Sequence, residues 1–137
     1  MNTFARTVDL MHRALDVTTV RRQVIANNLT NAETPGFKRS DVNFESSLRR
    51  ALESENNRPP LELTLTHERH IPNWRAQDYR DVQIRRVLDF TSSYNNCGNN
   101  VDPEHEFMLL TQNQMSYNLF VQAVSFEFAQ MNRILRS

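Results

Sequence analysis

Apolar residues recur at helical spacing at both ends of the chain, whereas the middle follows a different pattern. In the N-terminal segment they return at alternating steps of four and three residues, which is a heptad pattern. The predicted seam consists of Phe4, Val8, Met11, Leu15, Thr18, Arg22, Ile25 and Leu29, with Thr18 and Arg22 as its weak positions. The pattern predicts a first helix from about residue 3 to about residue 30.

The C-terminal segment repeats this spacing more regularly. Its predicted seam consists of Phe107, Leu110, Gln114, Tyr117, Val121, Val124, Phe128, Met131 and Leu135. Asp102-Pro103-Glu104 is a typical helix start, because Asp caps the first turn, Pro suits the first helical position and an acid complements the dipole. We therefore expect a second long helix from about residue 103 onwards.

This second helix has an unusual surface, because Glu127 is the only charged residue between Phe107 and Asn132. The remaining polar positions there are Gln, Asn, Ser and Thr. A helix in water normally carries charges on its free side. The sequence therefore predicts a helix that is covered nearly all round, beyond what one partner helix would cover.

The middle of the chain predicts short, mixed elements. Residues 41–52 favour a short amphipathic helix carrying Phe44, Leu48 and Leu52, and residues 54–60 a linker or turn. Residues 61–66 alternate with period two and predict a strand. Residues 75–81 favour a loop or disorder, and residues 81–90 favour a strand over a helix, with Val82 and Ile84 on one face. Residues 92–100 predict a turn-forming hinge.

These elements predict a mainly α fold in which the two terminal helices pair as an antiparallel, coiled-coil-like hairpin. Residues 1–32 and 101–137 would form this helical core, and residues 33–100 a small connecting module with a short helix and one or two strands. A lone hairpin is a poor folding unit, because it buries one seam and leaves its other sides exposed to water. We expect further copies or related chains to cover it; an ordinary monomeric bundle is the alternative.

Composition removes several functional classes. Lys+Arg and Asp+Glu number 16 each, so the net charge is zero and lacks the basic surplus of a general nucleic-acid binder. The single cysteine, Cys97, cannot form an internal disulfide. The first residues carry charges and no apolar core, so no cleavable secretory signal is expected. No apolar run approaches the length of a membrane span.

Candidate catalytic and metal-binding groups are few, and each has a simpler explanation. His67 and His70 would share a face on a helix, but the preceding residues alternate like a strand and no third ligand is evident. Nothing near Cys97 marks it as a nucleophile. We expect the pairs Arg21-Arg22 and Arg85-Arg86 to lie on solvated faces or in intersubunit ion pairs, and not to contact nucleic acid. We expect no catalytic site, no metal and no cofactor.

The segment A-N-N-L-T-N-A-E-T-P-G-F-K-R, residues 26–39, is more elaborate than a helix stop requires. Asn31 is expected to adopt the left-handed conformation of a helix C-cap. Pro35-Gly36 favours a type II turn, after which Phe37 leaves as an aromatic anchor. This predicted assembly turn comprises Asn27, Asn28, Leu29, Asn31, Thr34, Pro35, Gly36 and Phe37, with Lys38 and Arg39 as pairing groups.

Residues 27–32, N-N-L-T-N-A, and 34–39, T-P-G-F-K-R, resemble the N-terminal signature of flagellar basal-body rod and hook proteins. That signature reads A-N-N-L-A-N, two variable residues and T-P-G-(F/Y)-K. Thr30 departs from it, since alanine is usual there. His70-Ile71, the hinge at residues 98–102 and the lack of a large inserted domain resemble the proximal-rod member of the family.

The resemblance implies a structural, non-enzymatic subunit of the periplasmic rod, which transmits torque. It implies export through the flagellar type III apparatus without a cleaved signal. The implied partners are copies of the chain, other rod proteins, and a membrane-ring or export-gate adaptor protein at the rod base. A soluble adaptor or chaperone-like module that presents a helical hairpin to one partner is the alternative function, and a small regulatory or metal-dependent enzyme is a third.

Overall fold

A computed structural model describes residues 3–56, 66–71, 76–92, 94 and 96–136. In chain order its elements are α1 (Thr3–Thr30), β1 (Ser40–Asn43), α2 (Glu45–Asn56), the 3-10 helix η1 (Tyr79–Asp81), β2 (Arg85–Leu88) and α3 (Pro103–Leu135). The chain divides into two compact units, residues 1–42 with 86–137, and residues 43–85. The predicted mainly helical fold with a small middle module is confirmed.

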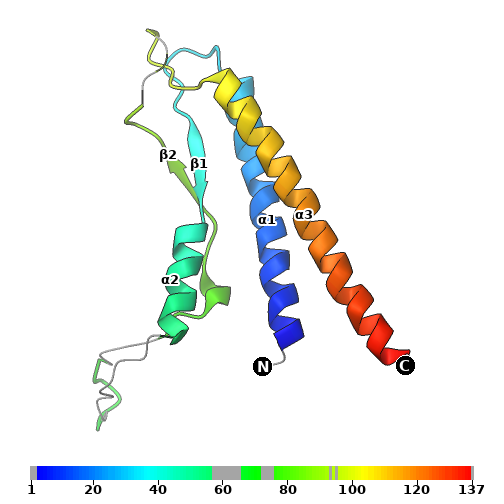
Figure 1. Ribbon diagram of the computed structural model, residues 1–137. Helices are drawn as coiled ribbons and strands as arrows, with labels where there is room; N and C mark the ends of the chain where they lie inside the picture. Colours follow the sequence, from blue (N-terminus) through cyan, green and yellow to red (C-terminus); the bar gives the residue numbers. More distant parts are fainter. Residues whose placement is uncertain (1–2, 57–65, 72–75, 93, 95, 137) are drawn as a thin grey trace. The chain divides into compact units, whose positions relative to one another are not determined.

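The larger unit is built on the predicted helical hairpin. α1 and α3 pack along each other in opposite directions, so both chain termini lie at the same end of the pair (Figure 1). The predicted bounds of α1 match the structure. Asp102 caps α3 as predicted, because its Oδ1 accepts hydrogen bonds from the backbone N–H groups of Glu104 (3.0 Å) and His105 (3.3 Å), and Pro103 begins the helix.

A two-stranded antiparallel sheet pairs β1 with β2. The predicted strand at residues 81–90 is present but shorter, since Val82 and Ile84 precede it. Beyond the strands, the Asp89 N–H donates to the Arg39 carbonyl at 2.9 Å. The strand predicted at residues 61–66 lies outside the described residues except for Thr66, which is not in a strand.

The smaller unit packs α2 against η1. The helix predicted at residues 41–52 begins only at Glu45, because residues 41–43 belong to β1. Phe44, Ala51, Tyr79 and Val82 are buried in this unit. The Gln77 N–H donates to the Ser54 hydroxyl at 2.9 Å and fastens the loop before η1 to α2. Residues 79–81, which were expected to be loop, form this 3-10 helix because Asp78 caps it through the Arg80 N–H.

The apolar surface of α3 faces outward to an unusual degree. Its two buried residues are Glu106 and Asn113, each one position before the predicted seam residues Phe107 and Gln114. The predicted seam is therefore offset from the positions that are buried against α1. Five of its members are 39–77% exposed, namely Phe107, Tyr117, Val121, Phe128 and Leu135. Leu110, Val124 and Met131 are half-buried.

A second stripe runs along the exposed side of α3. Met108, Met115, Leu119 and Phe126 follow one another at steps of seven, four and seven residues and are 58–67% exposed. We call these four residues the outer stripe. Steps of seven and four keep side chains on one helix face, so the outer stripe is a continuous apolar line.

Candidate assembly site

The turn that follows α1 has the geometry that Pro35-Gly36 predicts. The Phe37 N–H donates to the Thr34 carbonyl at 3.3 Å, and Gly36 has φ +72°. Together these define a type II turn, in which the third residue needs positive φ. A side chain at Gly36 would meet nothing within 4 Å, so the constraint on this residue comes from its backbone and not from space.

Asn31 ends α1 by a different device from the one expected. No described residue other than glycine has positive φ, so the prediction of a left-handed Asn31 is wrong. Instead the Asn31 Nδ2 donates to the Asn27 carbonyl at 2.8 Å and to the Asn27 Oδ1 at 3.1 Å. The Asn27 carbonyl also accepts from the Asn31 backbone N–H at 3.3 Å, so α1 ends with both the backbone and the side chain of Asn31 bonded to its last turn.

The hinge before α3 docks onto this turn. Asn99, which is fully buried, donates through Nδ2 to the carbonyls of Asn31 (3.0 Å), Ala32 (2.8 Å) and Thr34 (2.8 Å). Its Oδ1 accepts from the Val101 N–H at 2.7 Å. The side chain of Asn99 therefore holds the turn after α1 to the segment that leads into α3.

Two further contacts join the turn and the hinge. The Gly36 N–H donates to the Cys97 carbonyl at 3.1 Å, and the Lys38 Nζ donates to the Gly98 carbonyl at 2.8 Å. Gly98 has φ +80°, and a Cβ added to it would lie 3.9 Å from the Gly36 Cα. The positive φ, which other residues rarely adopt, explains why glycine occupies this point of the hinge.

Asn28 links the end of α1 to the first strand. Its Oδ1 accepts from the Ser40 N–H at 3.0 Å, and its Nδ2 donates to the Ser40 carbonyl at 2.8 Å. The side-chain amide thus pairs with Ser40 as another peptide group would in a sheet. The Asn28 Nδ2 also donates to the Glu106 Oε2 at 3.2 Å, so the same amide reaches α3.

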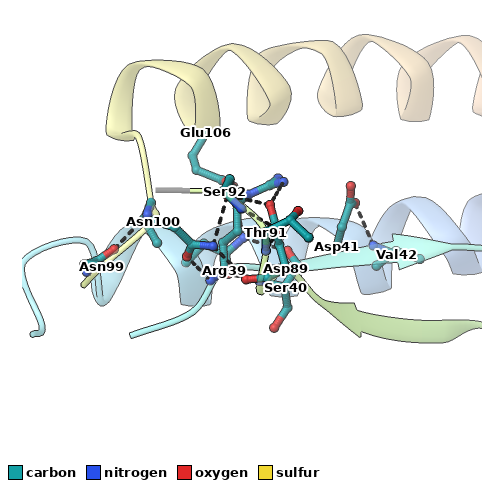
Figure 2. A network of polar contacts seen from close by, with 12 residues as sticks. Arg39, Ser40, Asp41, Val42, Asp89, Thr91, Ser92, Asn99, Asn100 and Glu106 are labelled. Atoms are coloured by element: carbon teal, nitrogen blue, oxygen red, sulfur yellow. Dashed lines mark hydrogen bonds and ion pairs between the residues drawn. The ribbon is translucent and has the colours of Figure 1, made fainter. Parts of the chain in front are cut away.

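Glu106 and Arg39 form an ion pair at the base of the hairpin (Figure 2). The Arg39 Nε donates to the Glu106 Oε1 at 3.0 Å, and the Arg39 N–H donates to the Asn100 Oδ1 at 2.7 Å. Glu106 is fully buried. Because a buried carboxylate must be paired and hydrogen-bonded to be tolerated, Arg39 and Asn28 are required partners of Glu106.

Asp89 lies at the edge of this network and is held in its charged form. Ser92 lowers the pKa of Asp89 well below its usual range by donating its hydroxyl to Oδ2 at 2.6 Å. The backbone N–H groups of Thr91 (2.9 Å) and Ser92 (3.1 Å) and the Thr91 hydroxyl (2.9 Å) act in the same direction at Oδ1. The Arg39 Nη1 lies 3.9 Å from Asp89 Oδ2, so the arginine faces two carboxylates.

Asn100 closes the network by joining Asp89 and Arg39. Its Nδ2 donates to the Asp89 carbonyl at 2.7 Å and to the Ser92 hydroxyl at 3.1 Å, while its Oδ1 accepts from Arg39. We call this connected set the polar lock; it consists of Asn28, Arg39, Ser40, Asp89, Ser92, Asn99, Asn100 and Glu106. It fastens both helices, the turn and the hinge at one end of the hairpin.

Some residues of the predicted assembly turn make hydrogen bonds within the polar lock or beside it, and others lie on the surface. Asn28, Asn31, Gly36, Lys38 and Arg39 make the contacts described above. Leu29 and Phe37 are half-buried, whereas Asn27, Thr34 and Pro35 are exposed. The N-terminal seam residues Phe4, Val8, Met11 and Leu15 are half-buried and Ile25 is buried. At the far end of the hairpin, the rings of Phe4 and Phe128 meet edge to face with centroids 5.7 Å apart.

Sequence reasoning missed Glu106, Asp89 and the individual roles of Asn99 and Asn100. Glu106 stands in the first turn of α3, where an acid is already explained by the helix dipole. The signal that could have revealed Glu106 was its spacing from Asn113, which lies seven residues later on the same face of α3. Among the described residues, no three His, Cys, Asp or Glu side chains gather as metal ligands. The rings of His67 and His70 are 5.8 Å apart.

This arrangement defines a class of protein: a helical-hairpin subunit whose polar interior is devoted to holding the hairpin closed. No established family model matches the chain. Curated relatives do match over nearly its whole length. Flagellar basal body rod protein FlgB of Borreliella burgdorferi is 42% identical over 99% of this chain and 100% of its own. FlgB of Bacillus subtilis is 31% identical over 98% of this chain and 97% of its own.

The relationship extends to more distant bacteria, since FlgB of Escherichia coli is 29% identical over 90% of this chain and 88% of its own. The chain belongs to the FlgB family of flagellar basal-body rod proteins. It is accordingly a structural protein of the flagellar basal body, and not an enzyme. It associates with other basal-body components. Within the described residues, none of the helices has the length and apolar content that a bilayer crossing requires.

Proposed function

We propose that the chain assembles through its terminal helices into the proximal part of the rod and there transmits torque. The observation that carries this proposal is the outer stripe of α3. Its four apolar side chains are 58–67% exposed on a helix that has one charged residue, Glu127, between Phe107 and Asn132. Contiguous apolar surface of this kind is typical of interaction sites, and neighbouring helices would cover it.

The polar lock supports a mechanical role for the hairpin. A subunit that transmits torque must keep its two helices from separating under load. Glu106, Arg39 and Asn28 connect α3, the start of β1 and α1 by hydrogen bonds that are buried or part-buried, and such bonds are costly to break. The Pro35-Gly36 turn contributes by bringing the following residues back to the hairpin, where Arg39 contacts Glu106 and Ser40 contacts Asn28.

The proposed partners are further copies of the chain, other rod proteins, and a membrane-ring or export-gate adaptor protein at the base of the rod. The proposed location is the periplasmic part of the basal body, reached through the flagellar type III export apparatus. The connecting module, residues 33–100, and the helical core, residues 1–32 and 101–137, are proposed to divide the contacts, with the core making the axial ones.

A matched pair of variants tests this proposal. Leu119→Glu places a charge in the outer stripe, whereas Asn118→Glu places the same charge beside it at an exposed position. In a strain that depends on this gene for its rod, we expect Leu119→Glu to abolish swimming and Asn118→Glu to be tolerated. Unchanged swimming with Leu119→Glu would contradict assembly through this face.

Purified protein separates the proposal from the adaptor alternative. A rod subunit should self-associate as its concentration rises, and Leu119→Glu should suppress that association in analytical ultracentrifugation. An adaptor module should instead remain a discrete species at all concentrations, and the substitution should leave its sedimentation unchanged.

A further inference from the structure

Asn113 and Thr18 form a polar layer inside the pairing of α1 and α3. Asn113 is 6% exposed, and Thr18 is buried. The Asn113 Nδ2 donates to the Thr18 main-chain carbonyl at 2.9 Å, while the Thr18 hydroxyl turns back to the Leu15 carbonyl at 2.8 Å. The contact across the helices therefore runs from a side chain to a backbone carbonyl that the small Thr18 leaves accessible.

This layer is not optimised for stability. The Asn113 Oδ1 is buried and has no hydrogen-bond donor among the described residues. A buried polar atom without a partner opposes folding, and an apolar residue at position 113 would avoid that penalty. A single buried asparagine in a helix seam is known to choose between alternative pairings at the expense of stability.

The two faces of α3 differ in polarity, and this difference bears on which helix packs against each of them. The face toward α1 carries Glu106 and Asn113, whereas the opposite face carries the apolar outer stripe. By hydrophobicity alone, the outer stripe of one subunit could pack against the inner face of α3 in another subunit and displace α1 from it. Correct assembly requires the inner face of α3 to pack against α1 of the same chain and not against α3 of another chain.

We infer that Asn113, with the Thr18 carbonyl, is a specificity-determining layer that reserves the inner face of α3 for α1. If the outer stripe of another α3 packed on this face, Met, Leu or Phe side chains would oppose Asn113. Both polar atoms of its amide would then be buried without partners, instead of one. The lost hydrogen bond disfavours this mispairing by about tenfold or more. The inference rests on the proposed assembly only in that it names the outer stripe as the competitor.

The test reads the pairing of α3 in the isolated chain, so it does not depend on rod formation. In a Cys97→Ser background, Ser116→Cys places one thiol three residues from Asn113, at a half-buried position of α3. A second chain, also Cys97→Ser, carries Met115→Cys in the outer stripe. When the two chains are mixed, a disulfide-linked dimer between them forms when the outer stripe of one α3 packs against the inner face of the other. We compare Asn113→Leu with Asn118→Leu, which adds the same side chain at an exposed position.

We expect Asn113→Leu to raise the melting temperature by about 3 °C or more, because it removes the unpaired oxygen. We also expect it to raise the rate of disulfide-linked dimer formation about fivefold or more, whereas Asn118→Leu changes that rate less than about twofold. An unchanged dimerisation rate for Asn113→Leu would overturn the inference. So would an equal rise for Asn118→Leu, or a fall in the melting temperature of Asn113→Leu.

Discussion

Asn99 offers the sharpest test of the polar lock. Its Nδ2 lies 2.8–3.0 Å from the carbonyl oxygens of Asn31, Ala32 and Thr34, while its Oδ1 accepts from the Val101 N–H. Asn99→Asp keeps the size, shape and acceptor of the side chain. It replaces the donating amide with an oxygen that faces three carbonyl oxygens.

The size of the effect follows from these contacts. An amide group has two hydrogens, so at least two hydrogen bonds are lost, at about 1 kcal/mol each. Asn99 is fully buried, so the oxygen that replaces its amide nitrogen is left without a donor, which adds about 1–3 kcal/mol. We therefore expect Asn99→Asp to lower the free energy of unfolding by about 4 kcal/mol at pH 7, a large part of a typical domain's 5–15 kcal/mol.

The destabilisation should depend on pH. The burial and the facing carbonyl oxygens raise the pKa of the introduced carboxyl above its unfolded value of about 3.9. A raised carboxyl pKa destabilises the fold above the unfolded value, so the loss should shrink as the pH falls from 7 towards 4. Below that pH the neutral carboxyl donates one hydrogen bond and restores part of the contact.

Urea unfolding followed by circular dichroism measures the effect. Asn96→Asp is the matched control, because Asn96 is exposed in the same hinge. With a typical slope of about 2 kcal/mol per molar urea, the midpoint of Asn99→Asp should fall by about 2 M, and that of Asn96→Asp by less than about 0.3 M. Equal midpoints for Asn99→Asp and Asn96→Asp would refute the clamp assigned to Asn99.

Three further substitutions test other parts of the site. Gly36→Val forces a β-branched residue to φ +72° and should reduce stability by about 1–3 kcal/mol and impair rod assembly more than export, whereas Gly36→Asn should be tolerated in swimming assays. Glu106→Gln keeps the size of the side chain but leaves Arg39 without its close counterion, and should lower the free energy of unfolding by about 3 kcal/mol in urea titrations; a change below about 0.5 kcal/mol would contradict a buried ion pair. The lowered pKa of Asp89 stabilises the fold above the ordinary value of 3.8 and loses that effect as the pH falls below it, so Asp89→Asn should show a shallower loss of stability between pH 5 and pH 2 than the unaltered chain; equal slopes would exclude this contribution.

The features that the sequence predicted correctly depend on local rules. The limits of α1, the cap at Asp102 and the type II turn at Pro35-Gly36 all follow from residues within a few positions of one another. The fold class followed from the heptad spacing of the two ends. These predictions needed no knowledge of which distant residues meet.

The features that it missed depend on contacts between distant residues. Glu106 is defined by Asn28 and Arg39, which precede it by 78 and 67 positions. β1 is four residues long and carries no alternating pattern that would distinguish it from a loop. The offset of the α3 seam arose because Glu106 and Asn113 lie on the buried face, and apolar periodicity assigns a buried face to apolar residues.

The central claim is that neighbouring subunits complete α3. Hydrogen exchange of the isolated monomer, compared with that of purified basal bodies, tests it most directly. We predict that in the monomer the amides of residues 24–34 and 99–113, which the polar lock holds, are the best protected, and those of 118–133 exchange fast. In the assembled rod, residues 118–133 should gain at least about a hundredfold in protection. Strong protection of residues 5–28 and 118–133 in the monomer, unchanged on assembly, would contradict the claim.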